Sequence, residues 1–286
     1  MRRRLLIAAA LAVGLIACGG AGGRQYELRG QVLAVDRTKG EITIKHEDIP
    51  GFMPAMTMPF RVKDARLLDG RAPGDLVTAT LVVEETDAYL TAVAKTGFSA
   101  IPTSAPPLPP AFGIEILKPG DTVPDQALVD QDGQARALAS WKGQVVALTF
   151  IYTRCPFPTF CPLMDRRFAA VQKAITNDPA LRASVHLLSV SFDPEYDTPE
   201  ILRKHAALRG ADPAVWSYVT APRDEVDRFA ARFGMSIVRG PTPADFTHTL
   251  RTAVIDREGR LAALHTGNEW TPDDLLRDIR NATAKR

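Results

Sequence analysis

The chain has 286 residues, enough for two ordinary domains, and its 24% charged and 45% hydrophobic residues are typical of a globular protein rather than a disordered one. Lys and Arg number 35 against 33 Asp and Glu, and three of the arginines lie at positions 2–4, so the rest of the chain is close to neutral, which argues against a nucleic-acid-binding protein. Three cysteines are too few for a disulfide framework, and no apolar run is long enough to span a bilayer.

The N-terminus has the pattern of a signal peptide over residues 1–17, with Arg2–Arg4 as its charged region and an apolar region behind them. It ends Leu15-Ile16-Ala17-Cys18, which resembles a bacterial lipobox, in which the cysteine is diacylated and becomes the mature N-terminus. The resemblance predicts a lipid-anchored protein at the periplasmic face of a bacterial membrane, with a flexible tether over residues 18–24. A plain secretory cut near Ala17 is the alternative.

Residues 25–97 have the pattern of an all-β domain, since short apolar and β-branched runs alternate with turn residues. The first two predicted strands flank a hairpin turn at Arg37–Gly40. Five short strands in so few residues predict a small, closed or nearly closed barrel of OB-like type. The predicted strands are Gln31–Asp36, Glu41–His46, Thr57–Val62, Leu76–Val83 and Tyr89–Lys95.

Residues 98–113 are rich in proline and predict a semi-stiff linker, after which residues 114–286 alternate strand and helix patterns. Such alternation around a cysteine-bearing strand-to-helix turn predicts an α/β domain with a thioredoxin-like fold. The predicted strands are Val145–Tyr152, Val185–Phe192, Val215–Val219, Leu250–Asp256 and Arg260–His265. The predicted helices are Pro162–Ile175, one capped by Thr198, Arg223–Phe233, and a last one that begins at Thr271.

Four residues with soft or borderline metal donors lie close together in the first domain, namely His46, Met53, Met56 and Met58. Three of the chain's six methionines fall between positions 53 and 58, and Met56 and Met58 would share one face of a strand. Thioether sulfur selects Cu(I), and a neutral imidazole from the neighbouring strand would complete a site of low coordination number. Alternatively, the methionines fill the barrel core, since Met is an ordinary filler of irregular gaps.

The string Met53-Pro54-Ala55-Met56-Thr57-Met58 with its upstream histidine resembles the CusF-type periplasmic copper- and silver-binding domain, over residues 25–97. The resemblance implies a small β-barrel in which His46, Met56 and Met58 hold the metal. In that family a tryptophan stacks over the metal, whereas this chain has Met53 at that place. Met53 is therefore a candidate third sulfur ligand.

Cys155 and Cys161 flank the predicted turn between the strand that ends at Tyr152 and the helix that begins at Pro162. A cysteine at a helix N-terminus feels the positive end of the helix dipole, which favours the thiolate. In an oxidising compartment the two thiols could form a redox disulfide, and as thiolates they could bind a soft metal ion. The alternative is a pair of small core residues, which fits less well beside prolines at a turn.

Four separated motifs resemble, in order, the Sco/SenC family over residues 114–286. They are Phe150–Pro156, Cys161–Met164, Ser191–Pro194 and Asp245–Thr249. Members of that family are membrane-tethered, thioredoxin-fold proteins implicated in copper delivery to cytochrome c oxidase, and they bind one copper ion through two cysteines and a distant histidine. The resemblance implies that Cys155, Cys161 and His248 are copper ligands and that Asp193 is an acidic residue close to them that does not bind the metal itself.

The spacing of the cysteines departs from that family, which usually has three residues between them. Here five intervene, Pro156-Phe157-Pro158-Thr159-Phe160. The longer loop can still bring two sulfur atoms together, because closing a few extra residues costs little entropy. Of the other histidines, His186 is expected to be a hydrogen-bonded core residue, and His205, beside Arg203 and Lys204, to be solvated.

Two copper-type constellations in one chain favour a copper metallochaperone over an enzyme. The barrel would collect copper, and the second domain would hold it for a copper-receiving membrane protein, which the resemblance suggests is a cytochrome c oxidase subunit. Two thiolates suit Cu(I), and an added imidazole makes Cu(II) tolerable as well. The competing hypothesis is a thiol–disulfide oxidoreductase or redox sensor of thioredoxin fold. Against it, the cysteine spacing is long, and His248 and Thr249 stand where those enzymes have a cis-proline.

Overall fold

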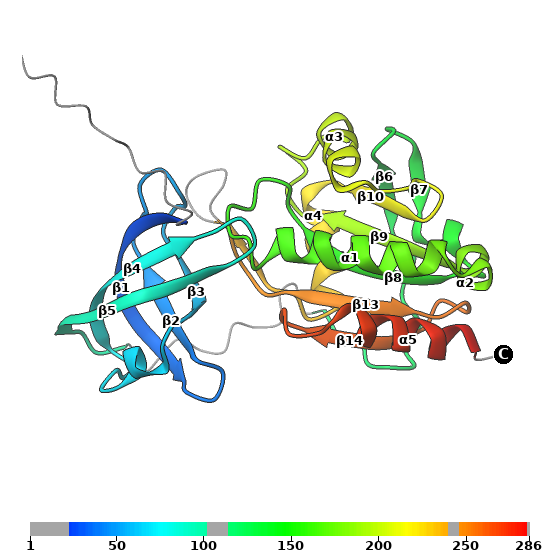
Figure 1. The fold of residues 1–286 in the computed structure, drawn as a ribbon. Coiled ribbons are helices and arrows are strands. Elements are labelled where there is room, and N and C mark those ends of the chain that lie inside the picture. Colours follow the sequence, from blue (N-terminus) through cyan, green and yellow to red (C-terminus); the bar gives the residue numbers. More distant parts are fainter. Residues whose placement is uncertain (1–22, 102–113, 240–245, 285–286) are drawn as a thin grey trace, which may run out of the picture.

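The computed structural model describes residues 23–101, 114–239 and 246–284, which form two adjacent bodies (Figure 1). The expected signal peptide, the lipobox cysteine Cys18 and most of the tether and of the proline-rich linker lie outside the described residues. None of the helices in the described part of the chain is long and apolar enough to cross a membrane.

The N-terminal body is one antiparallel sheet with the strand order β3-β2-β1-β4-β5. An isolated bridge joins Val62, just after β3, to Leu90 of β5, and the Lys63 amide donates to the Leu90 carbonyl at 2.8 Å. The two edges of the sheet therefore approach each other, and the predicted small all-β barrel is confirmed, while its OB-like assignment stays a prediction. The strands are β1 (Arg24–Asp36), β2 (Glu41–His46), β3 (Met56–Arg61), β4 (Asp75–Val83) and β5 (Ala88–Phe98).

The first strand of the barrel is longer than predicted, because β1 pairs with β4 from Arg24 onward as well as with β2. Gly30 lies where the two pairings overlap, opposite His46 on one side and Val77 on the other. A Cβ at Gly30 would lie 2.4 Å from the Lys45 carbonyl oxygen, so the strands can approach this closely only at a glycine. A short 3₁₀ helix, η1 (Ala65–Leu68), was not predicted.

The C-terminal body is a seven-stranded sheet with the order β14-β13-β8-β9-β10-β6-β7. The central strands β8 and β9 are parallel and buried at every position, as expected for strands covered on both faces. The strands are β6 (Ala127–Asp130), β7 (Ala135–Ala137), β8 (Val145–Ile151), β9 (Val185–Ser191), β10 (Trp216–Thr220), β13 (Arg251–Ile255) and β14 (Leu261–Thr266).

Helix α3 begins where its capping residue predicts. Thr198 caps α3 by accepting a hydrogen bond from the Ile201 amide, and Pro199 occupies the first helical position. Helices α1 and α5 lie side by side in front of the sheet in Figure 1. The helices are α1 (Cys161–Thr176), α2 (Pro179–Ser184), α3 (Pro199–Arg209), α4 (Arg223–Arg232) and α5 (Pro272–Ala284), with a 3₁₀ helix η3 (Leu138–Trp141).

Several short elements and the burial of one histidine differ from the sequence-based prediction. The β6–β7 hairpin, α2 and the two-stranded sheet of β11 (Ile237–Arg239) and β12 (Phe246–His248) are too short for a periodic pattern. His205 was expected to be solvated, which is wrong. Its side chain is buried, and Nε2 donates to the carboxylate of Asp165 at 2.8 Å. His186 was expected in the core, which is confirmed, since it is buried against Trp141 and bonded to Ser217.

Candidate metal centre

His46 and Met56 lie directly opposite each other on the neighbouring strands β2 and β3, so their side chains share one face of the sheet. Met58 follows two residues later on that face and is buried, whereas Met56 is half-buried. His46 Nδ1 lies 2.7 Å from the Glu47 carbonyl oxygen. Because a carbonyl oxygen only accepts, Nδ1 carries the proton of the neutral ring and Nε2 keeps the lone pair that a metal ion needs.

Met53 reaches the same region through a tight turn. The Ile49 amide donates to the Met53 carbonyl at 2.8 Å, and the Met53 amide donates back to Ile49 at 3.1 Å. Gly51 adopts a φ of 72° inside this turn, which few other residues would tolerate. The Asp48 carboxylate accepts from the Ala55 amide at 2.7 Å and holds the segment beside β3. Met53 is thereby buried beside the start of β3.

The two cysteines lie at the end of β8 and at the start of α1, as predicted, and both are buried as free thiols. Each sulfur changes the ionisation of the other. Burial raises the pKa of the Cys155 thiol, but hydrogen bonds from Cys161 and from the Tyr152 hydroxyl outweigh it, so the net shift is downward. Burial and the neighbouring Cys155 sulfur raise the pKa of Cys161 well above its usual range. Cys155 is thus the sulfur that becomes a thiolate first.

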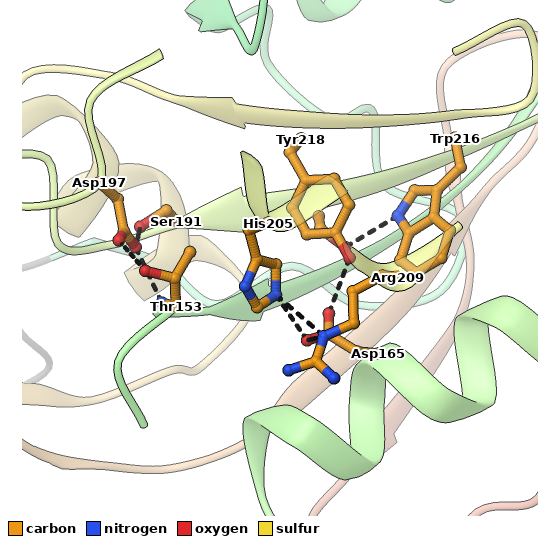
Figure 2. Close-up of polar contacts among 9 residues, drawn as sticks. Thr153, Asp165, Ser191, Asp197, His205, Arg209, Trp216 and Tyr218 are labelled. Carbon is orange, nitrogen blue, oxygen red and sulfur yellow. Dashed lines mark hydrogen bonds and ion pairs between the residues drawn. The ribbon is translucent and has the colours of Figure 1, made fainter. Parts of the chain in front are cut away.

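Two buried carboxylates fix the elements that hold the cysteines (Figure 2). Asp197 accepts the backbone amide of Thr153 at 3.0 Å and also accepts the hydroxyls of Thr153 and Ser191, which ties the segment before Cys155 to the end of β9. On α1, one turn after Cys161, Asp165 accepts from the Tyr218 hydroxyl at 2.9 Å and from His205 at 2.8 Å. The cysteine loop is therefore anchored at both of its ends.

Asp193, expected near the site, is buried and accepts two hydrogen bonds from Arg154, at 2.7 and 3.1 Å. Burial raises the pKa of its carboxyl group, against the opposite effect of Arg154. The Arg154 guanidinium also stacks over the ring of Tyr196, 4.5 Å from its centroid. Asp193 therefore fixes the residue next to Cys155.

His248 is the last residue of the short strand β12. Nδ1 donates to the Thr249 carbonyl at 3.1 Å, and the ring packs edge-on against Tyr152 and beside Phe192, with centroid distances of 5.7 and 4.9 Å. Burial among these rings lowers its pKa to about 4, so the imidazole is neutral near pH 7 and able to bind a metal ion. Within the described ranges, no three His, Cys, Asp or Glu side chains are grouped closely enough to hold one metal ion, so the set of Cys155, Cys161 and His248 stays a prediction.

The candidate residues of both domains meet at one cavity of about 20 Å³, which we call the interdomain cavity. The barrel contributes its methionines, and the C-terminal domain contributes one cysteine, the histidine and aromatic rings. Cys161 and His46 do not line it. The lining residues are Met53, Met56, Thr57, Met58, Tyr152, Cys155, Pro156, Phe157, Phe160, Phe246 and His248.

Contacts between the two domains surround this cavity. Phe157, from the loop between the cysteines, is 3% exposed, and its ring centroid lies 5.8 Å from that of Phe60 and 6.3 Å from that of Phe52, both in the barrel. Arg166 of α1 donates to the Thr86 carbonyl in the β4–β5 turn at 3.2 Å. Phe157 was not predicted as an interface residue. The signal that could have identified it is an aromatic residue between two prolines in an extended loop.

The two domains of the chain match two different families of known proteins. Residues 116–284 match the sequence model of the SCO1/SenC family, and residues 25–95 match that of the copper binding periplasmic protein CusF. The SCO1 protein homolog of Bacillus subtilis is 32% identical over 157 residues, which cover 54% of this chain and 79% of the homolog.

Solved structures agree with the family match. BsSco, described as a member of the Sco family of cytochrome c oxidase assembly proteins with a disulfide switch, is 28% identical, with a TM-score of 0.51 over 60% of this chain and 100% of its own. A SCO1/SenC family lipoprotein of Bacillus anthracis has a TM-score of 0.52 at 24% identity, over 58% of this chain and 98% of its own. The thioredoxin-like fold predicted for the C-terminal domain is thus confirmed. The family match spans more than half of the residues and agrees with these relatives, so the chain belongs to the SCO1/SenC family.

Proposed function

We propose that this chain is a copper metallochaperone that binds copper in both domains. The observation that carries the proposal is the interdomain cavity, around which thioethers, a thiol and an imidazole gather from two domains. Thiolate and thioether donors select Cu(I), and imidazole suits copper in either oxidation state. Hard cations such as Mg²⁺ prefer oxygen donors, and none of the described residues that line the cavity carries a carboxylate.

Each domain has its own candidate ligand set. In the barrel, His46, Met56 and Met58 would hold Cu(I), with Met53 as a further sulfur donor, in keeping with the match to the copper binding periplasmic protein CusF.

In the C-terminal domain, Cys155, Cys161 and His248 would hold one copper ion. The thiols of Cys155 and Cys161 are both buried and shift each other's pKa, and the His248 ring packs against Tyr152.

Relatives and the N-terminal sequence support a proposal for the acceptor and for the location. BsSco is described as a cytochrome c oxidase assembly protein, and we infer a subunit of that enzyme as the copper-receiving membrane protein. The lipobox string with Cys18 supports a lipid anchor at the periplasmic face of a bacterial membrane.

The His248→Ala substitution tests the proposal, because copper retention needs the imidazole and thiol exchange does not. We expect the variant to lose most of its bound copper on dialysis against a chelator, while its thiols still oxidise and reduce. His265→Ala is the matched control, since His265 lies in β14, pairs with Asp278 at 2.9 Å and does not line the cavity. Copper retention that is equal in both variants and the parent chain would contradict the assignment of His248.

A thiol–disulfide exchange activity is the second candidate, and the observation that favours it is the pair of buried free thiols whose pKa values shift in opposite directions. One thiol that ionises readily and a second one beside it are what nucleophilic attack and resolution require. In the samples described above, titration counts the reduced thiols, and a disulfide reductase assay measures the exchange activity. High disulfide reductase activity together with unchanged copper retention in His248→Ala would favour this candidate.

A further inference from the structure

The interdomain cavity combines donors that neither domain offers alone. The barrel contributes the thioethers of Met53, Met56 and Met58, and the C-terminal domain contributes the Cys155 thiol and the His248 imidazole. Its volume of about 20 Å³ is enough for about one water-sized guest. A single copper ion in this space would lie between sulfur atoms of both domains.

Aromatic rings form a large part of the cavity lining. Tyr152, Phe157, Phe160 and Phe246 are among its lining residues, and Phe157 is 3% exposed. Phe157 belongs to the loop between the cysteines, yet its ring packs on Phe60 and Phe52 of the barrel. The loop between the cysteines therefore provides the contact that docks the barrel beside Cys155.

We propose that the interdomain cavity is a shared Cu(I) transfer site, at which Cys155 and at least one barrel methionine bind the same copper ion. This rests on the proposed function and adds to it a route from one domain to the other. The docked domains make the exchange intramolecular, so copper need not enter solvent between the two ligand sets.

The exchange conserves atoms and charge without a redox step. As the bond between copper and the Cys155 sulfur forms, the thiol releases its proton to water. A methionine then leaves with its lone pair, and copper remains Cu(I). Cys161 is buried and does not line the cavity, and its thiol is the second one in the C-terminal ligand set that would receive the ion.

The test uses the full chain labelled with selenomethionine and carrying Cys18→Ser, so that every methionine offers selenium and Cys155 and Cys161 supply the only sulfur. One equivalent of Cu(I) is added, and X-ray absorption at the copper edge counts selenium and sulfur neighbours. We expect both kinds of neighbour around copper. Phe157→Ala and Phe52→Ala, which loosen the docking from either side, should each reduce the copper–selenium signal at least twofold, because charged thiolates then retain Cu(I) against neutral thioethers.

Phe98→Ala is the matched control, because Phe98 is 64% exposed in the barrel and does not line the cavity. It should leave both signals unchanged. Copper with only sulfur neighbours, or with only selenium neighbours, in the parent chain would overturn the shared site while leaving copper binding intact. Both signals unchanged in both Phe157→Ala and Phe52→Ala would mean two independent sites, which also overturns it. A chain that retains no copper would refute the proposed function itself.

Discussion

His186 offers a prediction whose size follows from the structure. Its ring is 5% exposed, stacks on Trp141, and has Nε2 within 2.9 Å of the Ser217 hydroxyl. Burial, and to a lesser extent the charge of Arg136, lowers its pKa from 6.5 to about 4. The folded protein therefore holds this histidine neutral at a pH where the unfolded chain has already protonated it.

The pH dependence of the unfolding free energy follows from the difference between the pKa of His186 in the folded and in the unfolded chain. The unfolded chain binds the additional proton between about pH 6.5 and 4, so the contribution of His186 is fully present above pH 6.5 and is lost as the pH falls toward 4. With about 1.4 kcal/mol for each pKa unit, the loss is about 2 kcal/mol between pH 7 and 5, and about 3 kcal/mol once both states are protonated.

The assay is urea unfolding of the copper-free chain at pH 7 and pH 5, compared with His186→Gln. Glutamine keeps a polar partner for Ser217 but does not titrate. We expect the parent chain to lose about 2 kcal/mol more than the variant over this interval, since every other titrating group is common to both. An equal loss in the two chains would refute the reasoning that burial holds His186 neutral.

Three further predictions concern the anchor, the barrel and the support of α1. Mass spectrometry of the membrane-isolated protein should find acylated Cys18 as the first residue, and a soluble product with another start would contradict the lipobox assignment. In residues 25–97 expressed alone, Met56→Leu with Met58→Leu should weaken Cu(I) binding at least tenfold in a competition titration while changing the unfolding free energy by under about 1.5 kcal/mol per site, because the shape is conserved and the soft donors are lost. Unchanged affinity would make these methionines core residues only. Asp165→Ala should lower the unfolding free energy by about 3 kcal/mol, because the buried groups of His205 and Tyr218 lose their acceptor, and equal denaturation midpoints would exclude that role.

The local pattern of the sequence was enough to predict the buried strands, the longer helices and the separate candidate ligands. The buried strands β8 and β9 are continuous apolar runs, and the start of α3 follows from Thr198 and Pro199, because these signals depend on neighbouring residues alone. The expectation for His205 was wrong because it used only the charged neighbours Arg203 and Lys204, whereas the burial of His205 depends on Asp165, which lies 40 residues away.

The sequence by itself determined which residues could bind copper, because thioether, thiol and imidazole groups are properties of residue types. Only the tertiary structure decided that the methionines of one domain and Cys155 of the other line a single cavity. That meeting depends on packing between residues about 100 positions apart, such as Phe157 on Phe60, and neither periodicity nor spacing along a chain carries information on contacts of this range.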